Sequence, residues 1–489
     1  MAKYSSGHSD GKRRGADLYF AASAVSQGAA LLRYVVLARL LGPTQLGMAA
    51  TLVLTSAFFD IISDTGSDRF LIQDRDGDVP AAQKLVQLVY ILRGVAIAAC
   101  LLVSAWPVAL FYKTPALAPG LMVLAISPFI MGFLHLDVRR YQRRMDFRAD
   151  AIAQLTAETL CLLVTLVAAW YLRSFKAVLF GLILRSAIIV LVSHLTAERR
   201  YEIGFSREHS GRLRRFAAPL MASGLLLFMA TQGDRAFVGR ELGLTALGRY
   251  SAVILLIYYP AVMLMRFTQV MYLPALAACR DNPAKRERLV SVFGGQTVLI
   301  ALAMIVGFAT VAPFLVTVLY GAKFRETAFV VALIGILQAS RFLIVWPTTV
   351  ALSEGRSTGP LAVNTVRLVA YPAALVGGWT LGGLAGVVVG FAFGEIAAQA
   401  TGVGLLNRAN GKPLLSDFDR IAGFVIVSAC ISAWPWTLEH HSSVGAAALA
   451  ALSVLSTVWI VRREMTTVRE SLALVSRVSH GLTARWQKA

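Results

Sequence analysis

Acidic residues, histidine and cysteine are all scarce in this sequence of 489 residues. The chain has 27 Asp and Glu against 47 Lys and Arg, only 7 histidines, and charged residues make up 15% of it. The four cysteines, Cys100, Cys161, Cys279 and Cys430, fall within or at the ends of apolar runs and form no close-spaced pair. This spacing argues against a disulfide framework and indicates no metal site.

Motifs typical of enzymes are also missing. There is no phosphate-binding loop of the nucleotide hydrolases, no His-Glu-x-x-His and no nucleophile elbow with partners. Asp60, Asp64 and Asp68 recur every four residues and could form a nucleotide-sugar or cation site. Solvated charges at a helix end are the plainer interpretation of this spacing. We therefore expect neither an enzymatic activity nor a cofactor.

What the sequence has in abundance is long apolar runs. Hydrophobic residues make up 57% of the chain and the mean hydropathy is +0.65. Continuous apolar runs of about 18–25 residues recur, as in proteins that cross a membrane many times by helices. The predicted fold is an all-α polytopic membrane protein with about 14 transmembrane helices. The spans are expected at residues 17–39, 46–65, 84–111, 116–136, 150–172, 175–196, 214–238, 247–273, 290–319, 327–352, 360–380, 383–405, 420–437 and 443–462.

The basic residues gather in short loops between these runs. The net charge of +20 could suggest nucleic acid, but loop positions explain it better and we expect no nucleic-acid partner. Alternate loops, counted from the N-terminus, hold 32 of the 47 Lys and Arg, and the intervening loops hold 9. By the positive-inside rule both termini are predicted to be cytoplasmic. The heaviest loops, residues 139–144 and 199–215, would also contact anionic membrane lipids.

A ten-residue stretch occurs twice. Residues 38–47 return, altered, as residues 239–248, with six identities at an offset of 201. Each copy ends one apolar run and begins the next, so it marks a tight corner between two helices. A repeat of this kind predicts two structural halves with a pathway between them. We expect bundles of six helices at 1–210 and 211–410, two added helices at 411–463, and a tail at 464–489. The tail reads as an amphipathic helix on the inner membrane face, with a disordered basic tail as the alternative.

Charged residues inside the apolar runs are the candidates for function. A charge at the bilayer centre costs about 3 kcal/mol on insertion scales, so each needs a partner or a water-filled cavity. Ion pairs between helices, or snorkelling, would explain Arg185 and compete with a cavity for Arg93 and Arg266. Arg33, Asp234, Arg341 and Arg367 lie deeper, and we expect them at a cavity. The intramembrane charges are Arg33, Arg93, Arg185, Arg266, Arg341 and Arg367 with Asp60, Glu158, Asp234 and Glu395; Arg235 adjoins Asp234.

Arginine outnumbers carboxylate within the spans, and this predicts an anionic cargo. Guanidinium stays charged in any environment and makes two-pronged contacts with phosphate or carboxylate oxygens. A pathway for cationic drugs should show the opposite balance. The candidate substrate-binding residues are therefore Arg33, Arg235, Arg266, Arg341 and Arg367.

The order of several loose motifs resembles a known family. They are Ala38-Arg39-Leu40-Leu41-Gly42-Pro43 with Gly47, Phe58-Phe59-Asp60, Ser63-Asp64-Thr65-Gly66, Gln232-Gly233-Asp234-Arg235, Tyr272-Leu273-Pro274 and Leu319-Tyr320-Gly321. In this order they resemble the oligosaccharide flippases of bacterial polysaccharide export, in the multidrug/oligosaccharidyl-lipid/polysaccharide exporter superfamily. The resemblance covers about the first 340 residues.

The resemblance implies a V-shaped, MATE-like pair of bundles around a central cationic cavity. It implies a cargo of undecaprenyl-diphosphate-linked oligosaccharide, flipped across the bacterial inner membrane by alternating access. A polysaccharide polymerase and a chain-length regulator would be candidate partners. Ion coupling through Asp60, Asp234 or Glu395 is a further hypothesis. The alternatives are a multidrug antiporter of the same superfamily and a membrane-embedded polysaccharide polymerase or ligase.

Overall fold

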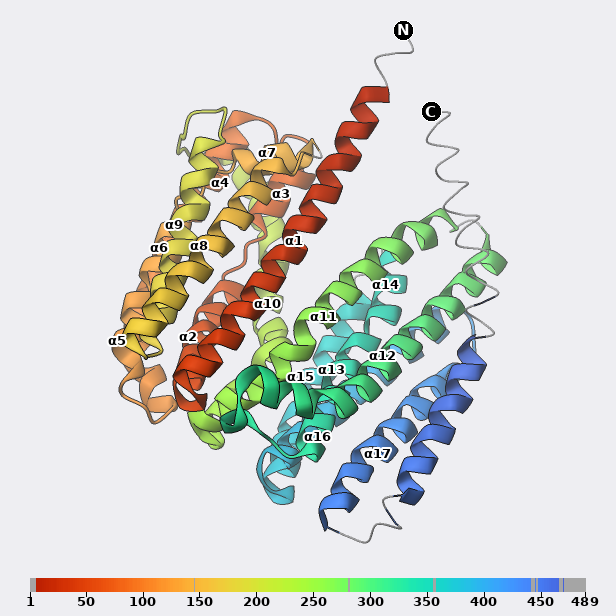
Figure 1. Ribbon diagram of the computed structural model, residues 1–489. Helices are drawn as coiled ribbons and strands as arrows, with labels where there is room; N and C mark the ends of the chain where they lie inside the picture. Colours follow the sequence, from red (N-terminus) through yellow and green to blue (C-terminus); the bar gives the residue numbers. More distant parts are fainter. Residues whose placement is uncertain are drawn as a thin grey trace. The chain divides into compact units, whose positions relative to one another are not determined.

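The structure consists of helices joined by loops in the residues that the computed structural model describes, which are 6–144, 146–279, 282–354, 358–440, 445, 447–465 and 469 (Figure 1). Nine of the described helices are long and apolar enough to cross a membrane. The chain is therefore a multi-pass membrane protein, as its apolar runs predict. The larger count of about 14 spans stays a prediction.

The helices form two compact units, which are described separately. One contains residues 1–252 and 319–324, and the other residues 253–318 and 325–489. The first unit begins with α1 (Ser6–Leu41), α2 (Pro43–Ile62) and α4 (Pro80–Phe111). It continues with α8 (Arg148–Leu172), α9 (Lys176–Leu195) and α10 (Arg207–Glu241). The expected division at residues 210 and 410 stays a prediction.

Two short helices of the first unit escaped prediction, and one expected span is broken. α3 (Ser67–Gln73) and α7 (Asp137–Arg143) are too short and too polar to show an apolar period. The expected span at 116–136 consists of α5 (Leu117–Leu124) and α6 (Ile126–Met131). The break precedes Pro128, whose ring cannot continue a regular helix without loss of a hydrogen bond.

The second unit contains most of α11 (Gly243–Ala278) and α12 (Pro283–Tyr320), followed by α13 (Ala328–Leu343) and α14 (Val345–Ser353). The interruption at Ile344 again comes shortly before a proline, Pro347. Next come α15 (Thr358–Leu381), α16 (Gly383–Ala409) and α17 (Phe418–His440), and residues 447–465 are helical too. The expected tail at 464–489 lies almost wholly outside the described residues.

Both copies of the repeated stretch form the corners that the sequence predicts. Gly42 separates α1 from α2, and Gly243 follows the end of α10 and begins α11. Their φ angles are 79° and 86°, in the left-handed region that favours glycine. Glycine at these two points therefore allows one helix to end and the next to start within about a residue.

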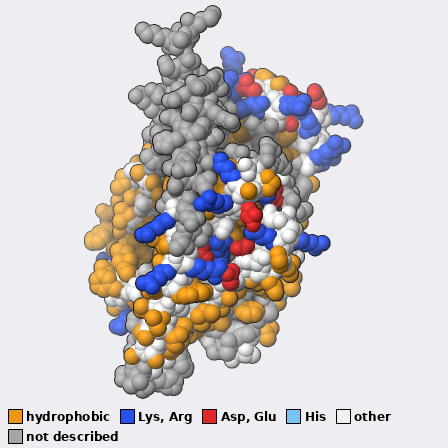
Figure 2. Space-filling model, turned by 90° about the vertical axis from the view of Figure 1, so that its right-hand side faces the viewer, with side chains coloured by type: hydrophobic (Ala, Val, Ile, Leu, Met, Phe, Trp, Pro, Cys, Tyr) orange, Lys and Arg blue, Asp and Glu red, His pale blue; other side chains and the backbone are white. Residues whose placement is uncertain are grey.

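Large apolar side chains cover much of the surface. Val103, Trp170, Tyr171 and Phe314 are all more than half exposed. Figure 2 shows hydrophobic side chains spread over the lower part of one face, with charged side chains gathered above. Exposed apolar surface of this extent is costly in water and normal against lipid.

Candidate functional site

A buried glutamate of the second unit is shared by two arginines. Glu395 of α16 is fully buried. Arg341 Nε donates to its Oε1 at 3.2 Å, and Arg367 Nε donates to its Oε2 at 2.8 Å. The Tyr371 hydroxyl also donates to Oε1, at 3.2 Å. Three of the predicted site residues, from α13, α15 and α16, thus meet in one cluster, here called the α16 triad (Arg341, Arg367, Glu395).

Small residues let α15 and α16 approach closely enough to form this cluster. A Cβ added at Gly378 would lie 2.8 Å from Val387 Cα, and one at Gly394 would lie 3.3 Å from Ala370 Cβ. Such contacts leave no room for larger side chains. The close approach holds Arg367 and Glu395 at bonding distance.

The first unit contains a cluster of the same composition. Arg33 Nη1 of α1 lies 3.1 Å from Glu158 Oε2 of α8, and Arg185 Nε of α9 lies 2.5 Å from Glu158 Oε1. Arg33 Nη1 also contacts Cys161 Sγ at 2.7 Å. The Arg185 side chain is 37% exposed, against 18% for Arg33 and 11% for Glu158. We call this the α8 triad (Arg33, Glu158, Arg185).

The two triads have nearly the same spacing between their glutamate and one arginine, but the order of the two residues is reversed. Glu158 and Arg185 are 27 residues apart and join the consecutive helices α8 and α9. Arg367 and Glu395 are 28 apart and join the consecutive helices α15 and α16. In the first pair the carboxylate comes first along the chain, and in the second the guanidinium does. Each triad holds two arginines and one glutamate, so with all groups ionised each has a net charge of +1.

A cavity with a mixed apolar and charged lining borders the α8 triad in the first unit. It has a volume of about 340 Å³ and its lining includes Asp60, Arg93 and Arg185. Arg93 Nη2 lies 3.6 Å from Asp60 Oδ1 and donates to the Asp60 carbonyl at 2.8 Å. Arg93 Nε donates to the Ser63 carbonyl at 3.0 Å, so this arginine also caps the last turn of α2. Asp60, whose side chain is 51% exposed, thus lines this cavity together with Arg93 and Arg185.

Three other predicted site residues lie outside both triads. Asp234 of α10 is fully buried and accepts a hydrogen bond from the Tyr250 hydroxyl at 2.8 Å. Arg235 Nη1 donates to Gln232 Oε1 at 3.1 Å. Arg266 lies on an exposed part of α11.

The two repeated corners contact each other backbone to backbone. The hydroxyls of Thr44 and Thr245 are 2.8 Å apart. A Cβ added at Gly47 would lie 1.8 Å from the Leu244 oxygen, and one at Gly248 would lie 1.9 Å from the Pro43 oxygen. Only glycine therefore fits at either contact. The two contacts are reciprocal, as an internal repeat requires.

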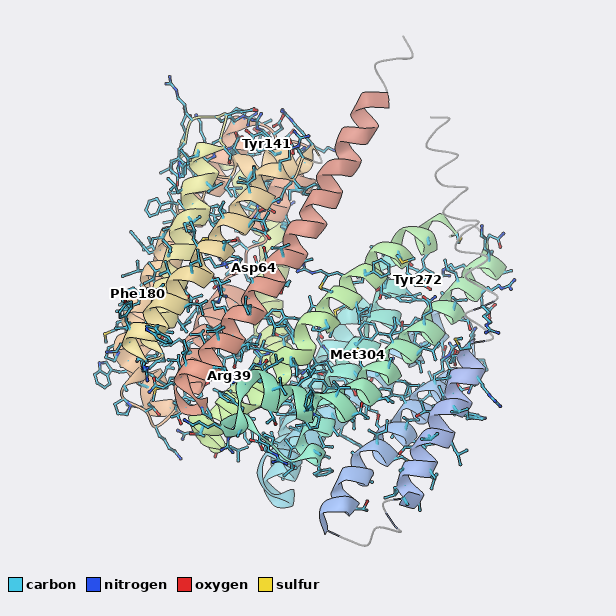
Figure 3. The ribbon with its side chains drawn as sticks, viewed as in Figure 1. Arg39, Asp64, Tyr141, Phe180, Tyr272 and Met304 are labelled. Carbon is cyan, nitrogen blue, oxygen red and sulfur yellow. The ribbon has the colours of Figure 1, made fainter. Side chains whose placement is uncertain are left out.

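Equivalent arginines reinforce this contact. Arg39 Nε donates to the Leu319 carbonyl at 2.8 Å, near the end of α12. Arg240, which is Arg39's counterpart in the repeat, donates to the Phe111 carbonyl at the end of α4. Figure 3 shows Arg39 near the end of α1 that leads into the corner. Each arginine thus satisfies a helix-end carbonyl that has no intrahelical donor.

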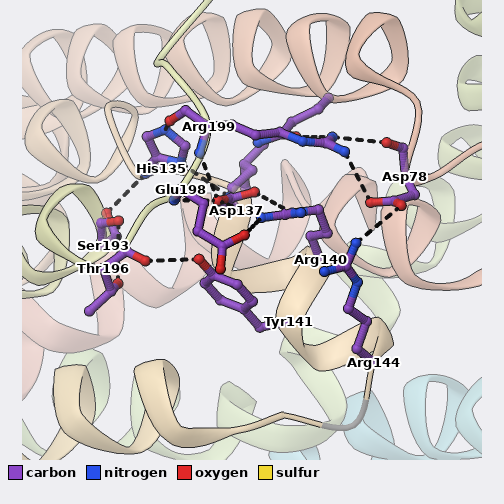
Figure 4. A network of polar contacts seen from close by, with 12 residues as sticks. Asp78, His135, Asp137, Arg140, Tyr141, Arg144, Ser193, Thr196, Glu198 and Arg199 are labelled. Atoms are coloured by element: carbon purple, nitrogen blue, oxygen red, sulfur yellow. Dashed lines mark hydrogen bonds and ion pairs between the residues drawn. The ribbon is translucent and has the colours of Figure 1, made fainter.

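At the loop end of the first unit, basic residues hold the loops together (Figure 4). Arg140 Nε donates to Asp137 Oδ1 at 2.7 Å, and the backbone N–H groups of Glu198 and Arg199 donate to Asp137 Oδ2 at 2.8 and 3.2 Å. Burial acts to raise the pKa of Asp137, but the Arg140 contact and these N–H groups together hold that pKa below its usual value. Much of the charge in the basic loops therefore has a structural role.

His135 in the same network is held neutral. Its Nδ1 accepts from the Asp137 N–H at 3.2 Å, and its Nε2 contacts the Arg199 carbonyl at 3.1 Å, so Nε2 carries the proton. Burial lowers the pKa of His135, and the neighbouring His194 lowers it further. Protonation of His135 at Nδ1 would place a second N–H group against the Asp137 N–H, and the hydrogen bond between them would be lost.

One group of residues in the described part of the chain has metal-ligand geometry. Side-chain ligand atoms of Asp76, Glu208 and His209 lie within 4.8 Å of one another. However, Arg212 Nη2 already lies 2.6 Å from Asp76 Oδ2. A guanidinium in this position competes with a metal ion for the carboxylate.

Sequence reasoning found the charged members of the triads but not their connections. Glu158 was visible as an intramembrane carboxylate, yet nothing in its spacing showed that Arg33 and Arg185 share it. Tyr371 and Tyr250, which bond to Glu395 and Asp234, gave no signal. A tyrosine in an apolar span is common, and only the fold reveals its partner.

Comparisons with known proteins agree with this architecture. The family model described as "Polysaccharide biosynthesis protein" matches residues 36–329. The lipopolysaccharide biosynthesis protein WzxC of Escherichia coli (strain K12) is 22% identical over 383 residues, covering 77% of this chain and 76% of that protein. The succinoglycan biosynthesis transport protein ExoT of Rhizobium meliloti (strain 1021) is 23% identical over 350 residues, covering 69% of each.

Solved structures show the same fold at low identity. The lipid II flippase MurJ, in an inward closed conformation, superposes with a TM-score of 0.68 at 12% identity, covering 91% of this chain and 97% of that one. A multidrug resistance transporter of the MATE family, inward-facing, gives a TM-score of 0.58 at 14% identity, covering 81% and 94%. The predicted all-α, MATE-like fold is confirmed.

Proposed function

This chain belongs to the family of polysaccharide biosynthesis proteins, and from that membership we propose that it flips a lipid-linked oligosaccharide across a membrane. The proposed cargo is an oligosaccharide repeat unit on undecaprenyl diphosphate, moved by alternating access for exopolysaccharide or lipopolysaccharide synthesis. On this proposal the chain is a transporter, not an enzyme. WzxC and ExoT are named for lipopolysaccharide biosynthesis and succinoglycan transport, which supports this class of cargo.

The observation that carries the proposal is the pairing of two arginines with one glutamate in each triad. An ion pair of one-to-one stoichiometry would leave no charge for a ligand. In each triad two guanidinium groups share one carboxylate, and the three residues come from three different helices. A diphosphate is a suitable partner because guanidinium contacts phosphate oxygens in two-pronged fashion.

The glutamates suggest how binding and release could be balanced. While Glu158 and Glu395 are ionised, they compete with a phosphate for the same arginines. Protonation of either glutamate would release guanidinium N–H groups to the cargo, so cargo binding and proton uptake would favour each other. We propose Glu395 as the first candidate for ion coupling, with Asp60 and Asp234 as the others. Arg235 and Arg266 stay candidate contacts along the path.

We further propose that the chain lies in the bacterial inner membrane with both termini in the cytoplasm. The charge bias of its loops is the main support. Arg420, near the start of α17, bonds to Ser291 Oγ at 3.1 Å and to Glu464 Oε1 at 3.1 Å. The start of α12, the start of α17 and the end of helix 447–465 therefore lie at one level, as the proposed topology requires. A polymerase and a chain-length regulator are the proposed protein partners.

The proposal is tested in a bacterial strain in which polymer export depends on this chain. The variant Arg341→Ala/Arg367→Ala should insert at normal levels, stop export and accumulate lipid-linked oligosaccharide. Arg408→Ala, on an exposed position near the end of α16, is the matched control and should export normally. Normal export by the double variant would remove the α16 triad from the pathway. Loss of drug resistance with normal export would favour a multidrug antiporter instead.

A further inference from the structure

A small basic cavity lies at the loop end of the first unit, beside the network of Figure 4. It has a volume of about 250 Å³ and lies between the first turns of α4 and residues 199–202. Lys84, Arg199 and Arg200 contribute three positive charges to its lining, and Glu202 is the one lining carboxylate. Tyr201 supplies a phenol. The charge and the hydrogen-bond donors suit a phosphate group.

The wall of this cavity is already ordered by its own contacts. Arg199 Nη1 donates to the Asp78 carbonyl at 2.8 Å and to Gln83 Oε1 at 2.9 Å. Gln87 Nε2 donates to the Tyr201 hydroxyl oxygen at 3.0 Å. Because that oxygen accepts, the Tyr201 hydroxyl proton can donate to a ligand. Residues fixed before binding lose little freedom when a ligand arrives.

Lys84 and Arg200 can contact a ligand at little cost in free energy. Lys84 pairs with Glu202, whose side chain is 48% exposed, and ion pairs open to water contribute little to stability. Arg200 is exposed and makes no ion pair within the part of the chain that the structure describes. An anion would therefore find one cation without a carboxylate and another that exchanges easily.

Exposed apolar residues flank the lining segment 199–202 along the chain, and they favour a lipid over a free phosphate as the ligand. Leu195, Ile203 and Phe205 are 75%, 51% and 72% exposed. α9 ends at Leu195 and α4 begins at Pro80, and both are long enough to span a membrane. The cavity thus lies at the ends of two helices that are long enough to span a membrane, where lipid headgroups are expected. Basic pockets at helix ends are known to take lipid headgroups.

We propose that this cavity binds the phosphate of an anionic membrane phospholipid, whose acyl chains lie against Leu195, Ile203 and Phe205. Lys84, Arg199, Arg200 and Tyr201 would contact the phosphate oxygens. The site is separate from both triads and does not depend on the proposed cargo. A bound lipid would tie the 199–202 loop to the start of α4.

The test titrates the purified full-length chain in neutral detergent with phosphatidylglycerol, with phosphatidylcholine as the zwitterionic probe. Bound lipid is counted by native mass spectrometry. Since each basic residue near a headgroup contributes about fivefold in affinity, Arg200→Ala should weaken phosphatidylglycerol binding about fivefold and Lys84→Ala/Arg200→Ala about 25-fold. The matched control, Arg148→Ala/Arg215→Ala, removes two exposed cations outside the cavity and should leave binding unchanged.

Several outcomes would overturn the proposal. An equal loss in the control would mean that only the total charge matters. Full competition by inorganic phosphate, with no effect of Phe205→Ser, would make this a free-phosphate site. Loss of lipid-linked oligosaccharide binding in Arg200→Ala, with phosphatidylglycerol binding retained, would assign the cavity to the cargo. If the double variant cannot be purified, Arg200→Ala alone decides the question, because Arg200 is exposed and makes no ion pair with any residue that the structure describes.

Discussion

At the scale of single residues, six of the intramembrane charges are held in two groups of two arginines and one glutamate, and not in simple pairs. The Glu395 carboxylate accepts hydrogen bonds from Arg341, Arg367 and Tyr371, and the side chain is wholly buried. Removal of a shared carboxylate leaves two guanidinium groups facing each other. Its loss should therefore cost more than the loss of either arginine.

A first prediction follows for Glu395→Gln. The variant should lower the free energy of unfolding by about 2 kcal/mol, because two buried cations lose their counter-ion while neighbouring groups compensate in part. A thermal melt of the purified protein measures the change. Adding Arg341→Gln should recover part of the loss, and Tyr371→Phe is the milder control. Equal melting temperatures for wild type and Glu395→Gln would mean that the carboxylate contributes nothing to the fold.

A second prediction concerns pH at the loop network. The pKa of His135 is lowered in the folded protein, so the neutral form is favoured and its contribution to stability is complete above the ordinary value of about 6.5. That contribution should be lost as the pH falls through the lower folded pKa. The melting temperature of the wild type should drop from about pH 6.5 downwards, and His135→Gln should flatten this part of the curve.

Asp137 adds to stability in a lower range of pH. Its folded pKa is depressed, so its contribution is complete above the unfolded value of about 3.9 and is lost only as the pH falls through the folded pKa. The effects of Asp137 and His135 on stability can thus be separated by pH.

For the His135 prediction, His209→Gln is the control, because it changes a buried histidine outside this network. An identical pH curve for wild type and His135→Gln would contradict the assignment.

At the scale of elements, the paired corners are the contact that joins the two repeats. Gly47 and Gly248 each face a backbone oxygen of the other corner at less than 2 Å from where a Cβ would stand. Such contacts form or separate as a whole, because a partial opening would leave helix-end groups without partners. If the protein alternates access, this contact is a natural point of separation.

Crosslinking the corners should lock the protein. The Thr44 and Thr245 hydroxyls are 2.8 Å apart, so cysteines at both positions fall within the reach of a disulfide, about 7 Å between Cα atoms. In a background without Cys100, Cys161, Cys279 and Cys430, oxidation should abolish export and reductant should restore it. Each single cysteine variant is a control. Full export with the crosslink in place would mean that the corners stay together during transport.

Gly47→Ala should have the opposite effect from the crosslink, because it should push the two corners apart. A methyl group 1.8 Å from the Leu244 oxygen forces the corners apart, which should favour the state in which they are separated. The rate of the Thr44–Thr245 cysteine crosslink should fall at least several-fold in this background. Gly28→Ala is the matched control, because no described atom outside the surrounding backbone of its own helix lies within 4 Å of its added Cβ. An unchanged crosslinking rate in Gly47→Ala would show that the corners yield without separating.

At the scale of the whole molecule, orientation is the property that the sequence predicts and labelling can test. Cysteines near Arg144 and Arg207 should be shielded from an impermeant thiol reagent in intact cells, because their loops carry the positive-inside signal. A cysteine near His440 should react. The reverse pattern of labelling would overturn the proposed topology.

The sequence predicted nearly every long helix, because an apolar run of membrane length has few other interpretations. It predicted neither α3 nor α7, because a helix of seven residues is too short to show a clear apolar period. Phe70 and Leu71 of α3 are buried in an apolar cluster, and arginine contacts with loop carbonyls and carboxylates also hold these two helices. Arg143, for example, donates to the Leu71 and Arg75 carbonyls at 3.2 and 3.0 Å. Arg33, Arg341, Arg367 and Glu395 were identified because charge is rare in apolar runs. Which of these residues share a partner depends on how three helices pack together, and the spacing along the chain does not reveal that packing.

The opposite polarity of the two triads has a consequence for how the chain assembles in the membrane. In a duplicated protein, a helix can dock against the partner that belongs to the other copy. If α16 took the place of α9 beside α8, Glu395 would face Glu158, and if α9 took the place of α16 beside α15, Arg185 would face Arg367. Like charges at these positions would repel within the bilayer, where little water is present to screen them. The reversed order of glutamate and arginine thus discriminates against exchange between the copies, so that each hairpin selects its own second helix during insertion.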